Sequence, residues 1–391
     1  MSQRSHIAIR PDWLATRHEE AIDSDRPIVD AHHHLFDRPG WRYLLDDLLA
    51  DVRSGHDVRA TVCVQSRAML RADGPEAMKP VGETEFANGV AAMSASGAYG
   101  DVRICAGIVG YADLRLGAAV RPVLEAHIAA AGGSAGQSGR FRGIRHIVVW
   151  DADPAMMNPA YPSTEDMLDS ADFRAGFAEL APLGLSFDAW LLFHQIPRLT
   201  RLARTFPGTQ IVLDHCGGVA LTGPYAGRRD EIFSTWSNAL KELATCPNVM
   251  VKLGGLGSRL SGFGFEDRPQ APSSAELADA WRPWMQTAIE TFGPDRCMFE
   301  SNFPMDKGSY SWVVGWNAMK RIAADLSTEE KDDLFWRSAT RFYRLAHILP
   351  LDAGKPSRVA QLDSAAIARF VNSTESETGQ RRLGELPAGR A

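Results

Sequence analysis

The stretch Ile28-Val29-Asp30-Ala31-His32-His33-His34 is a short apolar run that ends in three histidines. It is the first of eight such runs, each bounded by turn or polar residues, as buried parallel strands are. The others span 58–66, 102–110, 141–149, 185–193, 209–217, 249–257 and 297–304. Helical patterns separate them at 84–96, 116–131, 172–183, 196–206, 230–245, 275–292 and 311–326. Eight strands alternating with helices predict an α/β protein with the (β/α)8 TIM-barrel fold.

An open doubly wound sheet would give the same local alternation. No GxGxxG or GxxxxGKS/T motif follows any of the eight runs, which disfavours that alternative. We predict an N-terminal extension over residues 1–27, a barrel over 28–350 and a polar C-terminal extension over 351–391.

Composition narrows the class of protein. Hydrophobic residues make up 45% and charged residues 23% of the 391 residues, which is typical of a globular chain and excludes general disorder. No apolar run approaches the ~18 residues of a membrane span, and the N-terminus lacks the apolar core of a signal peptide. We therefore predict a cytoplasmic protein without a membrane partner. A net charge of −6 argues against a nucleic-acid partner.

The cysteines number five, an odd count, and no CxxC pair occurs. They are Cys63, Cys105, Cys216, Cys246 and Cys297. This pattern predicts buried free thiols and excludes both a disulfide framework and a cysteine-rich zinc site.

Histidines mark the ends of three predicted strands, where the chemistry of a barrel lies. His32 and His34 are two residues apart, so both point to the same side of the first strand and can share a metal ion or a substrate group. His33 points the other way, which favours a structural role. His194 and His215 end the fifth and sixth strands. Four imidazoles at one barrel mouth predict a site, since imidazole is the commonest ligand of zinc-type metals.

A polar cluster follows the eighth strand. Asn302 cannot titrate and so cannot act as a general base, whereas Glu300 and Asp306 can. The alternatives are that Glu300 is paired inside the barrel and that Asp306 caps the next helix.

Cationic and amide side chains also lie in or after apolar strands. Arg142 and Arg145 need an anionic partner, either a structural carboxylate or a substrate carboxylate or oxyanion. Gln65 and Arg67 end the second strand and are expected to face the mouth. Lys252 either pairs with Glu300 or serves as an active-site cation.

The order of these motifs resembles that of a known protein family. The HxH of His32 and His34 is followed by Phe-Arg-Gly-Ile-Arg, Phe-His-Gln, Leu-Asp-His-Cys-Gly-Gly and Phe-Glu-Ser-Asn-Phe-Pro. From about Ile28 to about Leu345 the chain resembles the amidohydrolase-2 branch of the amidohydrolase superfamily. That branch includes 2-pyrone-4,6-dicarboxylate lactonase, fuconolactonase, sulfomuconolactone hydrolases and an amino-carboxymuconate-semialdehyde decarboxylase. The resemblance implies a barrel hydrolase with its site at the mouth.

The resemblance also assigns residues. It implies that His32, His34, His194 and His215 are site residues, and that Arg142 and Arg145 belong to a substrate-carboxylate region. One position departs from the superfamily pattern, because Asn302 stands where an aspartate usually binds metal and activates water. Either Asp306 takes over that task, or histidines hold a metal that by itself lowers the pKa of water, to ~7 for zinc. Some lactonases of the branch work without metal.

We therefore predict a hydrolase that opens a lactone of a carboxylate-bearing small molecule. Water activated by a divalent metal on the four histidines, with zinc expected, or by Asp306, attacks the carbonyl, and Arg142, Arg145 or Arg67 binds the carboxylate. The alternatives are amide hydrolysis, non-oxidative decarboxylation of an aromatic or muconate acid, and a non-catalytic ligand-binding barrel supported by Asn302. Tryptophans on the late helices fit two interpretations, packing in the core and an interface of a homo-oligomer.

Overall fold

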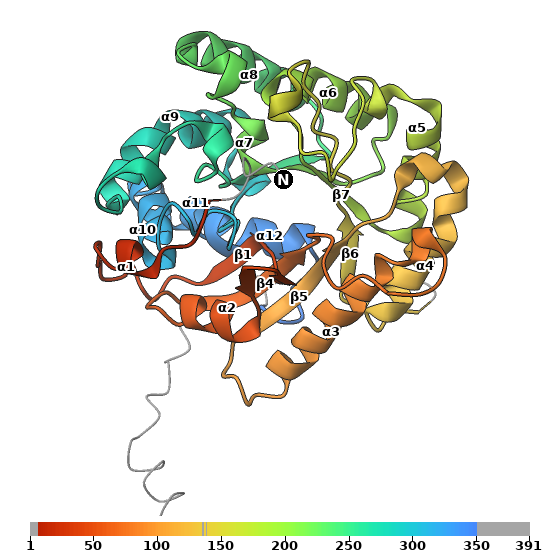
Figure 1. Cartoon of the computed structure of the whole chain (residues 1–391), viewed down its shortest axis with the longest axis horizontal. Coiled ribbons are helices and arrows are strands. Elements are labelled where there is room, and N and C mark those ends of the chain that lie inside the picture. Colours follow the sequence, from red (N-terminus) through yellow and green to blue (C-terminus); the bar gives the residue numbers. More distant parts are fainter. Residues whose placement is uncertain (1–6, 135–136, 138, 350–391) are drawn as a thin grey trace, which may run out of the picture. The chain divides into compact units, whose positions relative to one another are not determined.

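A computed structural model describes residues 7–134, 137 and 139–349 of the chain. Within these ranges one sheet contains eight parallel strands in sequence order. They are β1 (Ile28–His33), β4 (Val58–Val64), β5 (Arg103–Gly110), β6 (Phe141–Ile144), β7 (Ser186–Ala189), β8 (Ile211–Leu213), β9 (Val249–Leu253) and β10 (Cys297–Phe299). The ring closes just after β10, where the amide of His34 donates to Phe303 O at 2.8 Å. The prediction of a (β/α)8 barrel is confirmed (Figure 1).

Helices surround the ring of strands in Figure 1. The longer ones are α2 (Leu45–Val52), α3 (Val81–Ala95), α4 (Arg121–Ala130), α5 (Ala171–Ala178), α6 (Ile196–Thr205), α8 (Arg229–Leu243), α9 (Ser274–Phe292) and α10 (Trp312–Ile322). Helix α9 begins with a capping box in which Ser273 Oγ and the Glu276 carboxylate bond each other's backbone amides. It ends before Gly293, whose φ of 85° a residue with a side chain rarely adopts.

Several short elements carry no periodic signal long enough to read in the sequence. Beside a hairpin of β2 (Phe36–Arg38) and β3 (Trp41–Tyr43), they include α1 (Pro11–Leu14), α7 (His215–Gly218), α11 (Thr328–Asp332) and α12 (Ser338–Phe342). Single 3-10 turns occur in the connections, and residues 333–337 form a π-helical turn. The strands are shorter than the apolar runs, because the last residues of most runs leave the sheet and form the loops at the mouth.

Apolar side chains fill the layer between the strands and the helices. The tryptophans of the late helical segments, at 281, 284, 312, 316 and 336, are buried within the chain itself. Core packing therefore accounts for them. After α12, Tyr343 sends its hydroxyl into the barrel to Asp188 Oδ2, at 2.7 Å.

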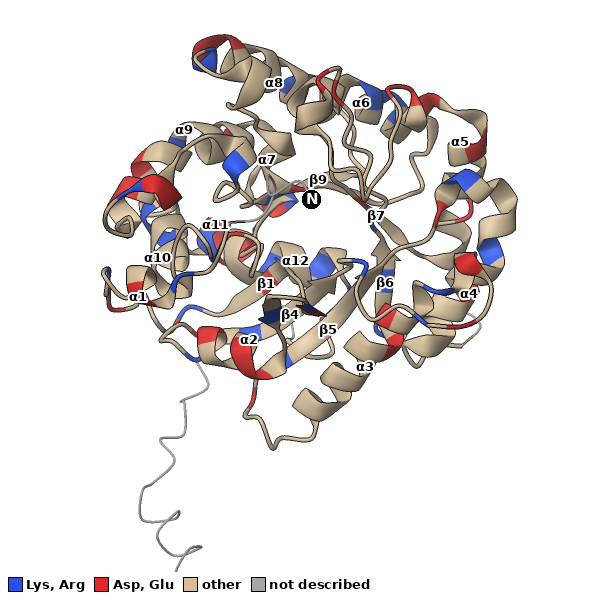
Figure 2. Cartoon of the chain, in the orientation of Figure 1, with Lys and Arg blue, Asp and Glu red and all other residues tan. Residues whose placement is uncertain are grey.

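The segment before β1 packs on late parts of the chain. Trp13 Nε1 donates to Arg268 O at 2.9 Å, and the amide of Ile22 donates to Asn317 Oδ1 at 2.8 Å. The predicted C-terminal extension, 351–391, lies outside the described residues. Figure 2 shows acidic and basic residues interspersed over the outer helices. None of the helices in the described ranges combines the length and apolar character that a membrane span requires.

Candidate active site

Two imidazoles meet at the carboxyl end of β1. His32 and His34 are buried, and their Nε2 atoms lie 3.2 Å apart. Their rings meet edge to face, with centroids 4.8 Å apart. The two-residue spacing of the HxH motif thus brings both side chains to one point, as strand alternation predicts.

The third imidazole is that of His215, which begins α7 directly after β8. Its ring centroid lies 4.6 Å from that of His32. His215 and Cys216 adopt φ of 56° and 51°, so the chain leaves the extended conformation abruptly and turns His215 to the mouth. Gly255 makes room for this ring, because a Cβ there would lie 2.5 Å from it. The structure therefore brings His32, His34 and His215 together.

Oxygen atoms lie beside Nδ1 of all three rings. His34 Nδ1 lies 2.8 Å from Val64 O, His215 Nδ1 2.6 Å from Glu300 Oε1, and His32 Nδ1 3.1 Å from Glu300 Oε2. For His34 and His215 this acceptor favours the proton at Nδ1, which leaves the Nε2 lone pair for a metal ion. His32 Nδ1 also lies 3.0 Å from Lys252 Nζ, a donor. Burial, followed by neighbouring cations, lowers the pKa of His32 and His34 well below 6.5, so both rings stay neutral. Glu300 is thus paired inside the barrel through its contact with His215 Nδ1, and its other oxygen faces His32.

A buried charge network lies beneath the imidazoles. Lys252 Nζ lies 2.7 Å from Asp188 Oδ2, 3.1 Å from Asp214 Oδ1 and 3.0 Å from His32 Nδ1. Burial raises the pKa of Asp188 to about 6. Lys252 therefore forms its closest ion pair with Asp188.

Asp214, which the sequence reasoning did not single out, faces the same centre as the imidazoles. Its Oδ2 has no hydrogen-bond partner among the described residues, whereas Oδ1 lies 3.1 Å from Lys252 Nζ in an ion pair. Asp214, His32 and His215 each offer one ligand atom, and these three atoms lie within 4.8 Å of one another. Two imidazole nitrogens and a carboxylate oxygen are a donor set that suits Zn²⁺. The residues present therefore fit a divalent metal.

Asn302 and Asp306 form a second, connected group beside the centre. Asn302 Nδ2 donates to Asp306 Oδ1 at 2.9 Å. Asp306 Oδ2 accepts from the Gly257 amide and from the Tyr310 hydroxyl, each at 2.9 Å. Burial raises the pKa of Asp306 to about 6. The predicted alternative, a helix cap, belongs instead to Ser311, which precedes α10.

Three of the four predicted substrate-binding residues on the early strands lie near the mouth. Arg145 Nη2 donates to Gln65 O at 2.6 Å, and its Nη1 lies 3.2 Å from His32 Nε2. Gln65 Oε1 is buried and has no partner within the described ranges. Arg142 instead lies near the start of β6, where its Nη1 donates to Gly139 O at 2.6 Å. Burial, followed by Arg344, lowers the pKa of Arg142 to about 10.

Arg67 lies at the rim, between two aromatic rings. Its guanidinium carbon is 4.1 Å from the centroid of Tyr111 and 4.7 Å from that of Tyr161. Its Nη1 donates to Ala160 O at 2.7 Å. Arg67 thus connects the loops that follow β4, β5 and β6.

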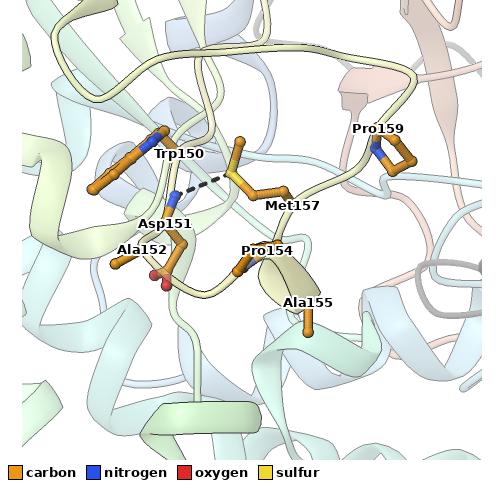
Figure 3. A pocket seen from close by; sticks show the side chains of 7 residues that line it. All are labelled: Trp150, Asp151, Ala152, Pro154, Ala155, Met157 and Pro159. Carbon is orange, nitrogen blue, oxygen red and sulfur yellow. Dashed lines mark hydrogen bonds between the residues drawn. The ribbon is translucent and has the colours of Figure 1, made fainter.

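The structure does not bring His194 to the imidazole centre. Its Nε2 lies 3.1 Å from Asp151 Oδ2, which also accepts from the Tyr225 hydroxyl at 2.6 Å. A cavity of about 590 Å³ borders Asp151 in the loop after β6 (Figure 3). Its lining comprises Trp150, Asp151, Ala152, Pro154, Ala155, Met157 and Pro159. A metal role for His194 stays a prediction, and these contacts favour a place at the rim.

A barrel with an imidazole and carboxylate centre at its mouth defines a class of hydrolases, and comparison with known proteins agrees. Residues 29–345 match the family model described as Amidohydrolase. An uncharacterized protein, y4mH, from Sinorhizobium fredii is 33% identical, over 82% of this chain and 100% of that protein. An L-fucono-1,5-lactonase from Burkholderia multivorans is 27% identical, over 83% of this chain and 98% of its own length.

A solved structure is similar as well. It is an amidohydrolase from Burkholderia multivorans with bound zinc, 27% identical, with a TM-score of 0.61 over 81% of this chain and 99% of that one. The chain belongs to the Amidohydrolase family, and the protein is a hydrolase.

Proposed function

We propose that this hydrolase opens the cyclic ester of a carboxylate-bearing small molecule. The observation that carries the proposal is the convergence of His32, His34 and His215 beside Arg145 at the barrel mouth. The relatives named L-fucono-1,5-lactonase support ring opening of a lactone as the reaction.

A divalent metal would be held by His32, His215 and Asp214, with His34 beside them. We propose zinc, which the donor set favours and which a similar amidohydrolase binds. When bound, such an ion lowers the pKa of water toward ~7 and polarises a carbonyl oxygen.

The chain's own residues divide the remaining tasks. Asp214 Oδ2 has no hydrogen-bond partner among the described residues, so it is available to take the proton of the attacking water. The water oxygen bonds to the lactone carbonyl carbon, the ring C–O bond breaks, and the same proton passes to the leaving oxygen. Glu300 orients His215.

Asp306 acts in this proposal as a positioning residue. It accepts one amide proton of Asn302 at Oδ1 and so fixes the orientation of the amide. Asn302 Oδ1 is buried, has no partner among the residues described, and is available to orient a water or a substrate hydroxyl. This assigns Asp306 to orientation, with proton transfer at Asp214.

Arg145 lies where it can pair with a developing oxyanion or with a substrate carboxylate, and its Nε lacks a described acceptor. Arg67, at the rim, is placed for a carboxylate further out. The cavity after β6 then receives the rest of the substrate.

The test is a panel of substrates with purified protein, with and without added zinc. Ring opening releases a proton at neutral pH, which an indicator dye follows. Carboxylated lactones, neutral sugar lactones, N-acyl amides and aromatic carboxylic acids are compared, with His215→Ala as the inactive control. Turnover confined to carboxylated lactones supports the proposal.

The other outcomes each remove one part of it. Preference for a neutral sugar lactone would show that the substrate needs no carboxylate. Release of CO2 or an amine without ring opening would show that the reaction is decarboxylation or amide hydrolysis. Tight ligand binding without turnover of any kind favours the non-catalytic barrel, which Asn302 supported at the level of sequence.

A further inference from the structure

The outer face of β1 carries a second cluster of metal-ligand side chains, separate from the mouth. His33 stands opposite Cys63 in the register of β1 and β4. Cys105 comes from the next strand, β5, where the register is interrupted. All three side chains are buried in the layer that helix α3 covers, since α3 packs on β5.

The backbone of β5 is bent so that Cys105 can join the cluster. Cys105 has a φ of 53°, a left-handed conformation that a residue with a side chain seldom adopts, least of all inside a strand. Its amide donates to Thr61 Oγ1 at 3.0 Å, which anchors the bend. Such strained positions persist where the surrounding structure holds them, and they gather at functional sites.

The donor atoms of the cluster are close enough for one ion. Each of His33, Cys63 and Cys105 offers one ligand atom, and these atoms lie within 4.8 Å of one another. Ligands about 2.0–2.3 Å from a zinc ion are roughly 3.5–4 Å apart, so binding needs only a small contraction.

The histidine of this cluster has an unsatisfied nitrogen. His33 Nε2 lies 2.8 Å from Thr61 Oγ1, whereas its Nδ1 is buried with no hydrogen-bond partner among the described residues. A metal-binding histidine commonly uses one nitrogen for the ion and the other for such an outer partner. Thr61 therefore orients both His33 and Cys105, and Nδ1 keeps a lone pair for an ion.

We propose that His33, Cys63 and Cys105 form a second metal site, for a thiophilic ion of the zinc class. On binding, the two thiols release their protons to solvent, and two thiolates with a divalent ion and a neutral imidazole sum to zero charge. A neutral site suits this dry layer, and soft sulfur ligands select zinc over hard cations such as Mg²⁺. Because the layer is closed by α3, the ion enters as the chain folds.

The site at the mouth offers only nitrogen and oxygen donors, so a sulfur-specific signal separates the two. We would express the full chain in medium in which cobalt replaces zinc, and record the near-ultraviolet thiolate-to-cobalt charge-transfer band. We expect this band in the wild type and in a His32→Ala His215→Ala double variant. It should disappear in Cys63→Ser and in Cys105→Ser, each with one equivalent of metal lost by mass spectrometry.

Cys297→Ser is the matched control, because Cys297 is also buried and free but lies outside the cluster. It should keep both the band and the metal. Should the serine variants fail to fold, the wild-type spectrum alone decides. A folded, cobalt-grown wild type without the band overturns the proposal, as does a band that persists in both serine variants. Loss of activity in the mouth variants with the band retained leaves this site standing, so its fate is independent of the proposed reaction.

Discussion

The two faces of strand β1 place the same residue type in two different chemical environments. On the inner face His32 and His34 meet imidazoles, carboxylates and a guanidinium, all nitrogen and oxygen donors. On the outer face His33 meets the hydroxyl of Thr61 and the sulfur atoms of Cys63 and Cys105. A shift of one residue in a strand therefore exchanges an environment of nitrogen and oxygen donors at the mouth for a closed one that contains two thiols.

Substitution of one histidine on each face of β1 is the strongest test of this contrast. We expect His32→Ala to lower kcat/KM by at least about 10³-fold on the substrate found in the panel, because it removes a ligand at the reacting centre. His33→Asn should lower it no more than about tenfold, through stability. Steady-state kinetics on both variants, with circular dichroism for folding, measures the difference. Equal losses would mean that the two faces are not functionally distinct.

The second test separates the partners that orient the histidines. Glu300→Gln removes the carboxylate that holds His215 Nδ1 and faces His32, and we expect metal affinity at the mouth to fall about 10–100-fold. Competition with a chelator measures that affinity. Thr61→Val removes the hydroxyl that contacts His33 and Cys105, and it should leave metal affinity at the mouth unaltered. A shift in the Thr61 variant equal to that in the Glu300 variant would contradict the separation.

The two ends of strand β6 allow a similar comparison, between two arginines. Arg145 lies beside His32, whereas Arg142 contacts Gly139 near the start of the strand. We expect Arg145→Lys to raise KM for a carboxylated substrate roughly tenfold or more, because the bidentate contact is lost. Arg142→Lys should change KM less than threefold. The reverse order would favour Arg142, which is one of the three arginines that the sequence offered for the substrate carboxylate.

The smallest expected effect concerns a histidine held only for packing. Burial lowers the pKa of His127 from 6.5 to about 4, and the ring lies between Thr84 and Tyr111 O. Between these values the unfolded chain binds the proton better, so the free energy of unfolding falls as pH falls from 6.5 toward 4. The difference between pH 7 and pH 5.5 is about 1 kcal/mol.

Urea unfolding of the wild type and of His127→Gln at the two pH values measures this effect. The variant should lose the share of the pH dependence that His127 contributes. If the free energy of unfolding changed equally with pH in both proteins, a group other than His127 would be responsible.

The fold could be predicted from the sequence because its signal is long and regular, as eight apolar runs recur between helices. Convergence of His32, His34 and His215 could also be predicted, since strand ends meet at one mouth. Asp214 was missed for a physical reason. It precedes His215, so strict alternation would turn the two to opposite faces, whereas the chain leaves the extended conformation at His215 and both face the centre.

The outer cluster was missed for a related reason. Cys63 and Cys105 are far apart in sequence and form no CxxC motif, so their count alone excluded a cysteine-rich zinc site. Their proximity depends on the pairing of β4 with β5 and on the bend at Cys105.

The sequence did contain a signal for the buried carboxylates of the barrel. Lys252 is a charged residue within an apolar strand and therefore needs anionic partners, which are Asp188 and Asp214.

Arg67, stacked between Tyr111 and Tyr161, has a consequence for how such a barrel diversifies. The loops of a barrel are usually treated as modules that can be exchanged one at a time on a constant scaffold. Here one guanidinium joins the loops after β4, β5 and β6, so a graft of any one of them would leave an arginine or a tyrosine without its neighbour. Redesign of substrate range should therefore transplant these three loops as a set.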